Sequence, residues 1–464
     1  MVDDEKVRIE EDSLGEVAVP ADAYWGAQTQ RAIENFPISG EGMDPRFVRA
    51  LGVVKRAAAQ ANRQLELLEE PIATAIESAA TEVIEGEHDD QFPVDVFQTG
   101  SGTSTNMNAN EVIANRASEI LNAPVHPNDH VNFGQSSNDV IPTAMHVAAL
   151  QATETELLPA LETLVASLAA KAEEFDDVVK TGRTHLQDAT PVRLGQEFSG
   201  FQRQIRKGIE RIESATAGLS ELALGGTAVG TGLNTHPEFS RLACRSITEA
   251  TGIDFTEASN HFEAQATHDA MVHAHAAVRT VSGSMDKIAH DLRLLASGPR
   301  NGISELDQPE NQPGSSIMPG KINPVLAESI NQIHARVLGN DATIGHGGSS
   351  GQLELNLYKP VIATDFLESV SLLASGAEAF ATRFVDRLEA NETRCAEQVE
   401  RSLALATALN PEIGYDAAAT VAKRALAEGK SVREVAVEAG YLSPEEAESV
   451  IDPRAMTEPG ILTD

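Results

Sequence analysis

The segment GSSIMPGKINPV, which runs from Gly314 to Val325, brings together residue types that suit the binding of an anion. Asn323 is a good N-cap residue and Pro324 suits a first helical turn, so a helix is predicted to begin here. The free N–H groups and the positive dipole end of such a helix attract anions. Lys321 adds a full positive charge at the same place. Local chemistry leaves two interpretations open, an anion site or a capped helix behind a turn.

Two earlier segments, FQTGSGTSTNMNANEV and HVNFGQSSNDV, also place hydroxyl and amide side chains just ahead of a predicted helix. Each segment alone is typical of ordinary helix capping. Three helix starts that carry more donors than capping needs predict one shared pocket, suited to a small anion with more than one carboxylate. The donors concerned are Ser101, Thr103, Ser104, Thr105, Asn106, Ser136, Ser137 and Asn138.

A fourth segment, KTGRTHLQDATPVRLGQEF, supplies a histidine between hydroxyl and amide groups. A lone histidine is usually structural, but His185 follows Thr184 in a polar turn ahead of a helix, which makes it a candidate acid or base. Glu328 lies in the first turns of the helix predicted after Asn323. If the two segments meet in the fold, this carboxylate is placed to orient the imidazole.

Two other features resemble a nucleotide site and a metal site, but their sequence context disfavours both. The glycine-rich stretch GGTAVGTGLNTHPEF looks like a dinucleotide loop, but no predicted strand precedes it, so nucleotide binding is disfavoured. His268, His273 and His275 suggest a metal site, yet His273 and His275 are two residues apart and point to different faces of a helix. We therefore predict no metal.

Long helices must position these groups. Asp44 and Pro45 suit the start of a helix over about 45–65, and apolar residues recur at helical spacing along it. Similar patterns predict helices at about 107–121, 140–175, 192–222, 266–297, 324–340 and 357–391, several of them on the order of 45 Å long. Strand signals are few, mainly near VRIEEDSLGEVAVP. The fold class is therefore mainly α, with a mixed, mostly helical N-terminal domain (1–138), a long central helical bundle (139–395) and a small helical C-terminal domain (396–464).

The central helices carry small and aliphatic residues on more than one face, as in MVHAHAAVRTVSGSMDKIAHDLRLLASG. A helix that is apolar most of the way round requires burial on all sides. A bundle made by one chain would leave some of these faces exposed, so we expect the helices to pack against other copies.

The excess of acidic over basic residues limits the classes of molecule that the chain can bind. The 464 residues include 70 acidic and 35 basic side chains, a net charge of −35. Such a chain repels nucleic acids and anionic membranes. It suits a salt-rich cytoplasm that screens self-repulsion, although ordinary acidic solubility is the alternative. Cys244 and Cys395 form no disulfide or metal pattern, the N-terminal stretch has no signal-peptide pattern, and no apolar run approaches 18 residues, so a cytoplasmic location is expected.

Five further motifs accompany GSSIMPGKINPV: PADAYWGAQTQRA, FQTGSGTSTNMNANEV, HPNDHVNFGQSSNDVIPTAMH, TGRTHLQDATPVRLGQEFSG and GGTAVGTGLN. Together they resemble the fumarase/aspartase superfamily, a group of lyases built as helical homotetramers, over nearly the whole chain. Their order is that expected for class II fumarases. His185 separates this branch from the aspartases, which usually carry glutamine there and tend to read STND where this chain reads SSND.

The resemblance implies reversible hydration of fumarate to (S)-malate through an aci-carboxylate carbanion, with no metal or organic cofactor. It also implies a homotetramer with active sites shared between three subunits. Ser315 matches the catalytic base, His185 the second catalytic residue on the water side, and Glu328 its partner carboxylate. The positions that match the family's substrate contacts are Ser101, Gly102, Thr103, Asn106, Ser136, Ser137, Asn138, Thr184, Ser316, Lys321 and Asn323.

One departure concerns the second, peripheral anion site of the family, which matches His126, Pro127, Asn128 and Asp129. Some members carry basic residues just before this stretch, whereas the residues here are LNAPV, which weakens the case for a peripheral site. Two alternatives stay open: an aspartate ammonia-lyase of the same superfamily, and a non-catalytic structural or binding relative. Every matched catalytic position is filled, which argues against the second.

Overall fold

The computed structural model describes residues 7–460. Helices dominate this part of the chain, and its strands form four two-stranded sheets. The chain divides into two compact units, each assembled from three segments that are separated in sequence. Unit 1 comprises the residues up to Pro159, Ile209–Ser282 and Ala335–Ala374, and unit 2 comprises Ala160–Gly208, Gly283–His334 and the residues from Ser375 onward. The three-domain division made from the sequence stays a prediction.

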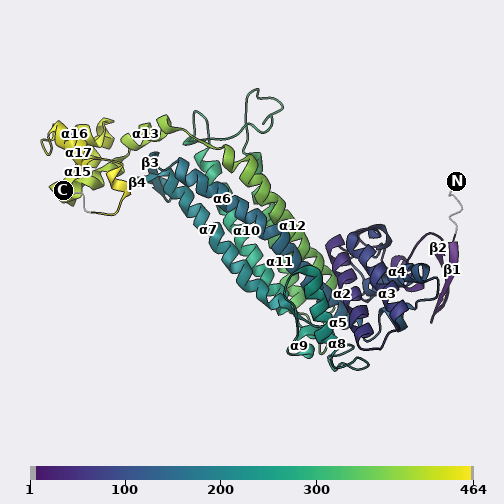
Figure 1. Ribbon diagram of the computed structural model, residues 1–464. Helices are drawn as coiled ribbons and strands as arrows, with labels where there is room; N and C mark the ends of the chain where they lie inside the picture. Colours follow the sequence, from purple (N-terminus) through teal and green to yellow (C-terminus); the bar gives the residue numbers. More distant parts are fainter. Residues whose placement is uncertain (1–6, 461–464) are drawn as a thin grey trace. The chain divides into compact units, whose positions relative to one another are not determined.

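Unit 1 begins with the predicted strands. β1 (Val7–Asp12) and β2 (Gly15–Pro20) form an antiparallel hairpin, drawn as arrows in Figure 1. Helices follow, because the apolar spacing changes from two residues to between three and four. They are α1 (Ala27–Asn35), α2 (Pro45–Gln64), α3 (Glu70–Glu85), α4 (Thr103–Leu121), α5 (Ser137–Ala152), α8 (Phe239–Thr251) and α9 (His261–Ala266), together with the short parallel pair β5 (Glu221–Leu222) and β6 (Thr256–Glu257).

Helix α2 shows how the sequence specifies the helices of this unit. The Asp44 carboxylate accepts a hydrogen bond from the Arg46 N–H, and Pro45 occupies the first turn, as predicted. A cap of this kind contributes about 1 kcal/mol. Phe47, Leu51 and further apolar residues at helical spacing are buried, mainly against α3, α5 and α8.

Five long helices contribute residues to both units: α6 (Leu158–Glu174), α7 (Leu194–Thr216), α10 (Asp269–Leu295), α11 (Val325–Gly348) and α12 (Lys359–Arg383). All were predicted, and the helix expected over 140–175 is present from Ser137 to Glu174, although it is not α-helical throughout. It is split by a π-helical turn, Thr153–Leu157, where the Leu158 N–H bonds to the Thr153 carbonyl five residues earlier. Pro159 has no N–H to continue the regular ladder, which explains the interruption.

The sequence analysis missed a hairpin in unit 2. β3 (Val179–Thr184) pairs with β4 (Gln187–Arg193), with an irregular register between Thr181 and Arg183. α7 therefore begins at Leu194, and it ends at Thr216 rather than near 222. Likewise α12 ends at Arg383 rather than near 391, where β8 (Glu389–Ala390) pairs with β7 (Leu306–Asp307).

The C-terminal part of unit 2 contains short helices, as the sequence predicts. Ser431 and Ser443 each form a capping box with a glutamate three residues later, which explains two of the helix starts. The helices are α13 (Glu392–Glu400), α14 (Asn410–Ile413), α15 (Tyr415–Glu428), α16 (Val432–Glu438) and α17 (Pro444–Val450). α13 packs against β3, whereas the four later helices surround a cluster that includes Leu405, Leu409, Val421, Val435 and Ile451.

None of the helices in the described part of the chain combines the length and the apolar character needed to cross a membrane.

Candidate active site

The first predicted donor segment forms the start of α4 in unit 1. Gly102 is the N-cap residue in a left-handed conformation (φ 77°), where a Cβ atom would lie 2.9 Å from Ile141. The expected helix start near 107 is therefore wrong. Thr103 to Asn106 form the first turn of α4, and the Ser101 and Thr103 hydroxyls lie 2.8 Å apart. The N–H groups of a helix start thus lie beside several hydroxyl and amide groups.

The second donor segment begins α5 through a capping box. The Ser136 hydroxyl accepts a hydrogen bond from the Asn138 N–H (3.2 Å), and Asp139 accepts one from the Ser136 N–H (2.9 Å). The helix therefore starts at Ser137, three residues before the predicted start at Val140. The Asn138 amide donates to the Ala228 carbonyl (2.8 Å), which ties this segment to the glycine-rich stretch.

Asn106 joins the two donor segments. Its amide nitrogen lies 3.3 Å from the Asn132 Oδ1 atom and 3.5 Å from the Ser137 hydroxyl. Asn106, Asn132, Gln135, Ser136, Ser137 and Thr227 are among the residues that line a cavity of about 750 Å³. Two of the three donor segments thus contribute side chains to one cavity of unit 1. The single pocket expected for all three segments stays a prediction.

The HPND stretch lies beside the same cavity, because Asn128 and Asp129 also line it. His126 uses its Nδ1 atom to accept hydrogen bonds from the N–H groups of Asn128 (3.2 Å) and Asp129 (3.0 Å). This ring nitrogen and these two backbone N–H groups therefore already have hydrogen-bond partners in one another. The arrangement adds a second reason to doubt that the stretch binds an anion by itself.

The glycine-rich stretch forms part of the cavity wall, a role that the sequence analysis missed. The buried Asp139 carboxylate accepts hydrogen bonds from the N–H groups of Gly225 (3.0 Å) and Thr227 (2.9 Å). Thr227 has a positive φ of 56°, which is rare for a β-branched residue, and Gln265 binds its carbonyl (2.7 Å). The many glycines in the stretch were the available signal, since a backbone that approaches other segments closely favours glycine.

The GSSIMPGKINPV segment, in unit 2, folds back on itself. The Gly314 N–H donates to the Lys321 carbonyl (2.8 Å), and the Asn323 amide donates to the Gly314 carbonyl (2.7 Å). Lys321 in turn donates to Asn323 Oδ1 (2.7 Å). α11 begins at Val325, and the prediction that Asn323 caps it through its side chain is wrong, because that side chain is occupied by the loop.

Ser315 is half-buried at the base of this loop, whereas Ser316 is exposed. The Ser315 hydroxyl oxygen accepts hydrogen bonds from the N–H groups of Ile317 (3.2 Å) and Met318 (2.9 Å). Two donors aimed at one oxygen favour its negatively charged form over the neutral hydroxyl. The loop therefore contains both a possible base and part of the means to activate it.

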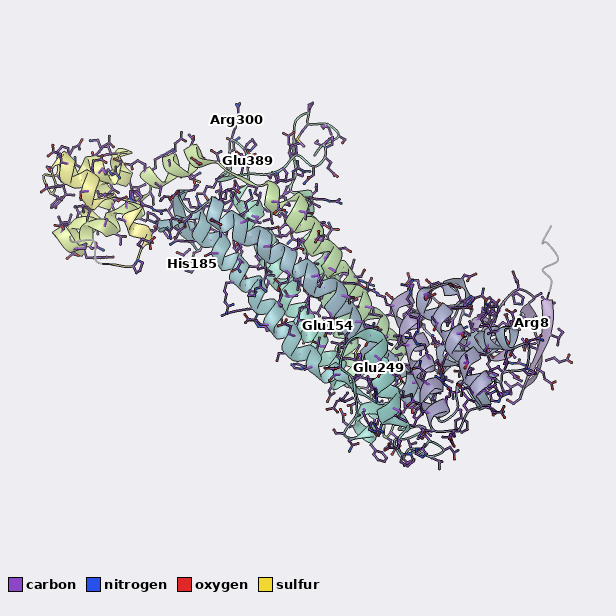
Figure 2. The ribbon with its side chains drawn as sticks, viewed as in Figure 1. Arg8, Glu154, His185, Glu249, Arg300 and Glu389 are labelled. Carbon is purple, nitrogen blue, oxygen red and sulfur yellow. The ribbon has the colours of Figure 1, made fainter. Side chains whose placement is uncertain are left out.

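His185 and Thr184 lie at the exposed turn between β3 and β4, where Figure 2 labels His185. His185 and Leu186 both have positive φ angles, 55° and 58°. Glu328 lies in the first turn of α11 and lines a cavity of about 440 Å³ with His290 and Arg293. No hydrogen bond joins His185 to Glu328 in residues 7–460, so the expected pairing is not made within this single chain.

Comparisons with known proteins extend over the whole chain. Residues 15–339 match the family described as Lyase, and residues 405–458 match the family described as Fumarase C C-terminus. The chain is 69% identical to "Fumarate hydratase class II" of Halobacterium salinarum, with 99% of both chains covered. It is 55% identical to the protein of the same name from Nitrosomonas europaea, over 98% of this chain and 100% of the other. The crystal structure of a class II fumarase from Schistosoma mansoni is 41% identical and superposes with a TM-score of 0.95, covering 97% of this chain and 99% of that one.

Proposed function

Since the chain belongs to the Lyase family and, within it, to the class II fumarate hydratases, we propose that it is a hydro-lyase that interconverts fumarate and (S)-malate. Besides family membership, one structural observation supports this proposal. Two helix starts rich in hydrogen-bond donors line the same cavity, and Asn106 connects them. Such an arrangement suits a small dicarboxylate. The resemblance supports Ser101, Gly102, Thr103, Ser136, Ser137, Asn138, Thr184 and Ser316 as further substrate contacts.

In the direction of dehydration, Ser315 removes a proton from the malate carbon next to one carboxylate. The carbanion formed is stabilised as an aci-carboxylate dianion, which requires positive charge and donors that are in place beforehand. Lys321 and Asn323, already bonded to each other, supply these. The carbon–oxygen bond to the hydroxyl group then breaks, and the leaving hydroxide takes a proton from His185 and departs as water. These residues supply base, acid and charge, so we propose a reaction that uses no metal or organic cofactor.

We further propose a homotetramer in which three subunits contribute to each active site. This accounts for the exposed position of His185, which forms no bond to Glu328 in its own chain. It also accounts for the small and apolar residues on several faces of α10. A cytoplasm rich in salt is the proposed location, because it screens the net charge of −35.

A substrate panel tests the proposed reaction. Purified protein given (S)-malate, without added metal, is expected to produce fumarate, seen by its ultraviolet absorbance, while aspartate and argininosuccinate give no product. Fumarate formed from aspartate but not from malate would establish the ammonia-lyase instead, an alternative that His185 disfavours. Absence of turnover with all three compounds would favour a non-catalytic relative.

The role of Ser315 is tested by Ser315→Ala. Loss of the base should lower kcat by about 10²–10⁴-fold, the range typical of acid–base catalysis, while the elution volume of the assembly stays unchanged. Ser78→Ala is the control, because Ser78 is an exposed serine of α3 whose hydroxyl donates to the Thr74 carbonyl within the same helix. Turnover of Ser315→Ala near that of the control would remove Ser315 from the mechanism.

A further inference from the structure

Lys55, in the middle of α2, has an ammonium group buried inside unit 1. Its side chain is fully buried (0% exposed). Its Nζ atom donates to the Asn132 Oδ1 atom (2.9 Å) and to the Gln135 Oε1 atom (3.0 Å). It forms no ion pair with any described residue. A buried charge without a counter-ion is costly, so its presence requires an explanation.

The two partners of Lys55 connect it to the cavity described above. Asn132 and Gln135 line that cavity, and the Asn106 amide donates to the same Asn132 oxygen that Lys55 contacts. One side chain, Asn132, therefore lies between Lys55 and Asn106, and two lie between Lys55 and the hydroxyl of Ser137. The sequence analysis gave no attention to Lys55, because a lysine in a helix is usually solvated.

Lys55 also holds the two amide groups in one orientation. With their oxygens turned toward the ammonium group, their nitrogens bind backbone carbonyls: Asn132 Nδ2 binds that of Gln135 (3.1 Å), and Gln135 Nε2 binds those of Val131 (3.0 Å) and Phe133 (3.2 Å). This network fixes the shape of the cavity wall between a π-helical turn at Pro127–Val131 and the start of α5.

Asp139 lies near two buried lysines, so this group of three side chains has a net positive charge when both lysines are protonated. Lys359 is also fully buried, and its Nζ atom lies 3.3 Å from the Asn138 carbonyl. The negative charge of Asp139 favours the protonated form of both lysines, and three backbone N–H groups already bind this carboxylate. Burial lowers the pKa of Lys55 and of Lys359 to about 7. An anion in the cavity favours the charged form of both lysines.

We propose that Lys55 is a positioning residue for the dicarboxylate, which holds the Asn132 and Gln135 wall in place and supplies positive charge beneath the cavity. This inference rests on the proposed function, because it assumes that the cavity receives the substrate. It also explains how a chain of net charge −35 attracts a dianion. The site carries its own buried positive charge, shielded from the acidic surface.

A charge effect has a signature that a packing effect lacks. Removal of one positive charge changes the binding energy in proportion to the charge on the ligand. For Lys55→Met we expect binding of a monoanion to weaken about tenfold and binding of a dianion about a hundredfold, so that the second factor is the square of the first. A variant that only loosens the cavity wall would weaken both ligands by the same factor.

The experiment measures binding of succinate and butyrate by calorimetry to the full-length assembly, at constant ionic strength and just below neutral pH. Lys55→Met is compared with Arg56→Met, the matched control. Arg56 is the next residue of α2, and its guanidinium turns toward Thr81 of α3 (3.3 Å). Lys55→Gln is the second variant, because its amide can still donate to one of the two oxygens if the methionine variant does not fold.

The proposal is supported if the dianion factor exceeds the monoanion factor in a folded Lys55 variant and both factors stay near one in Arg56→Met. It is overturned if either folded Lys55 variant binds both ligands as the control does, or weakens both equally. Turnover of malate by the wild-type protein is measured in parallel. A wild-type protein that neither turns over malate nor binds succinate contradicts the proposed function itself, which separates the two failures.

Discussion

The hydroxyl of Ser315 is a weak base by itself, and its surroundings favour the alkoxide form, which is a stronger base. A serine hydroxyl becomes useful only when its alkoxide form is stabilised. The N–H groups of Ile317 and Met318 already lie at hydrogen-bond distance from its oxygen. In a closed active site from which water is excluded, these two donors act more strongly than in solvent.

His268 is a second residue whose surroundings determine its protonation. It is buried, and within the described residues neither ring nitrogen has a hydrogen-bond partner. Burial, with the nearby charge of Lys359, lowers the pKa of His268 well below its ordinary value. The folded protein therefore keeps this ring neutral under conditions in which the unfolded chain binds a proton.

This difference predicts a pH-dependent stability. As the pH falls below about 6.5, the unfolded chain binds a proton that the folded chain does not, so the free energy of unfolding decreases by about 1.4 kcal/mol per pH unit for each such proton. His268→Gln should reduce this decrease in urea unfolding between pH 7 and pH 5, whereas His236→Gln, at an exposed position, should not. The decrease should not vanish, because burial also lowers the pKa of His146. Equal slopes in wild type and His268→Gln would contradict the prediction.

The loop from Gly314 to Asn323 works as one element, because its ends are hydrogen-bonded to each other. Gly314 is required at this closure: a Cβ atom there would lie 2.4 Å from the Lys321 carbonyl oxygen and 2.9 Å from the Asn323 nitrogen. Any larger residue must push apart the two groups that we propose to stabilise the dianion. The backbone closure of the loop and the positions of the Lys321 and Asn323 side chains thus depend on the same close contact at Gly314.

Gly314→Ala should therefore lower kcat/KM by about a hundredfold, since a displacement of about 1 Å is enough for such a loss. The melting temperature should change little, because most of this loop is exposed. In the control Gly218→Ala, the new Cβ atom meets only the Ala270 Cβ atom at an ordinary 3.5 Å. Activity of Gly314→Ala equal to that of the control would show that the loop does not need this closure.

For the whole molecule, the net charge of −35 opposes both folding and association when salt is scarce. The apolar faces of the long helices favour association at any salt concentration. The balance between these two effects depends on screening. High ionic strength should therefore favour the assembled state.

Transfer from molar to millimolar NaCl should accordingly dissociate the proposed tetramer, as measured by analytical sedimentation. Sucrose at equal osmolality is the control, because it does not screen charge and should not restore the assembly. A sedimentation coefficient that stays constant across this range would argue against a salt-dependent assembly.

The helical architecture, the strand signals near β1 and β2 and the residue types of the candidate site were all readable from the sequence. Helix and strand periods and N-cap signals such as Asp44 and Ser136 are local properties, which a sequence expresses directly. The family motifs added the expected roles of Ser315, His185 and Glu328. Most errors concerned the ends of helices, as at Gly102, but the β3–β4 hairpin was missed altogether.

The contacts between distant segments were decided only by the folded structure. Nothing in the sequence indicated that Lys55 reaches Asn132, 77 positions later, or that Asp139 holds the backbone at Thr227. These contacts depend on how α2, α5 and the glycine-rich stretch pack, and packing is a property of the whole unit. A buried charge is therefore hard to recognise beforehand, because the same lysine on the outer face of α2 would be an ordinary solvated side chain.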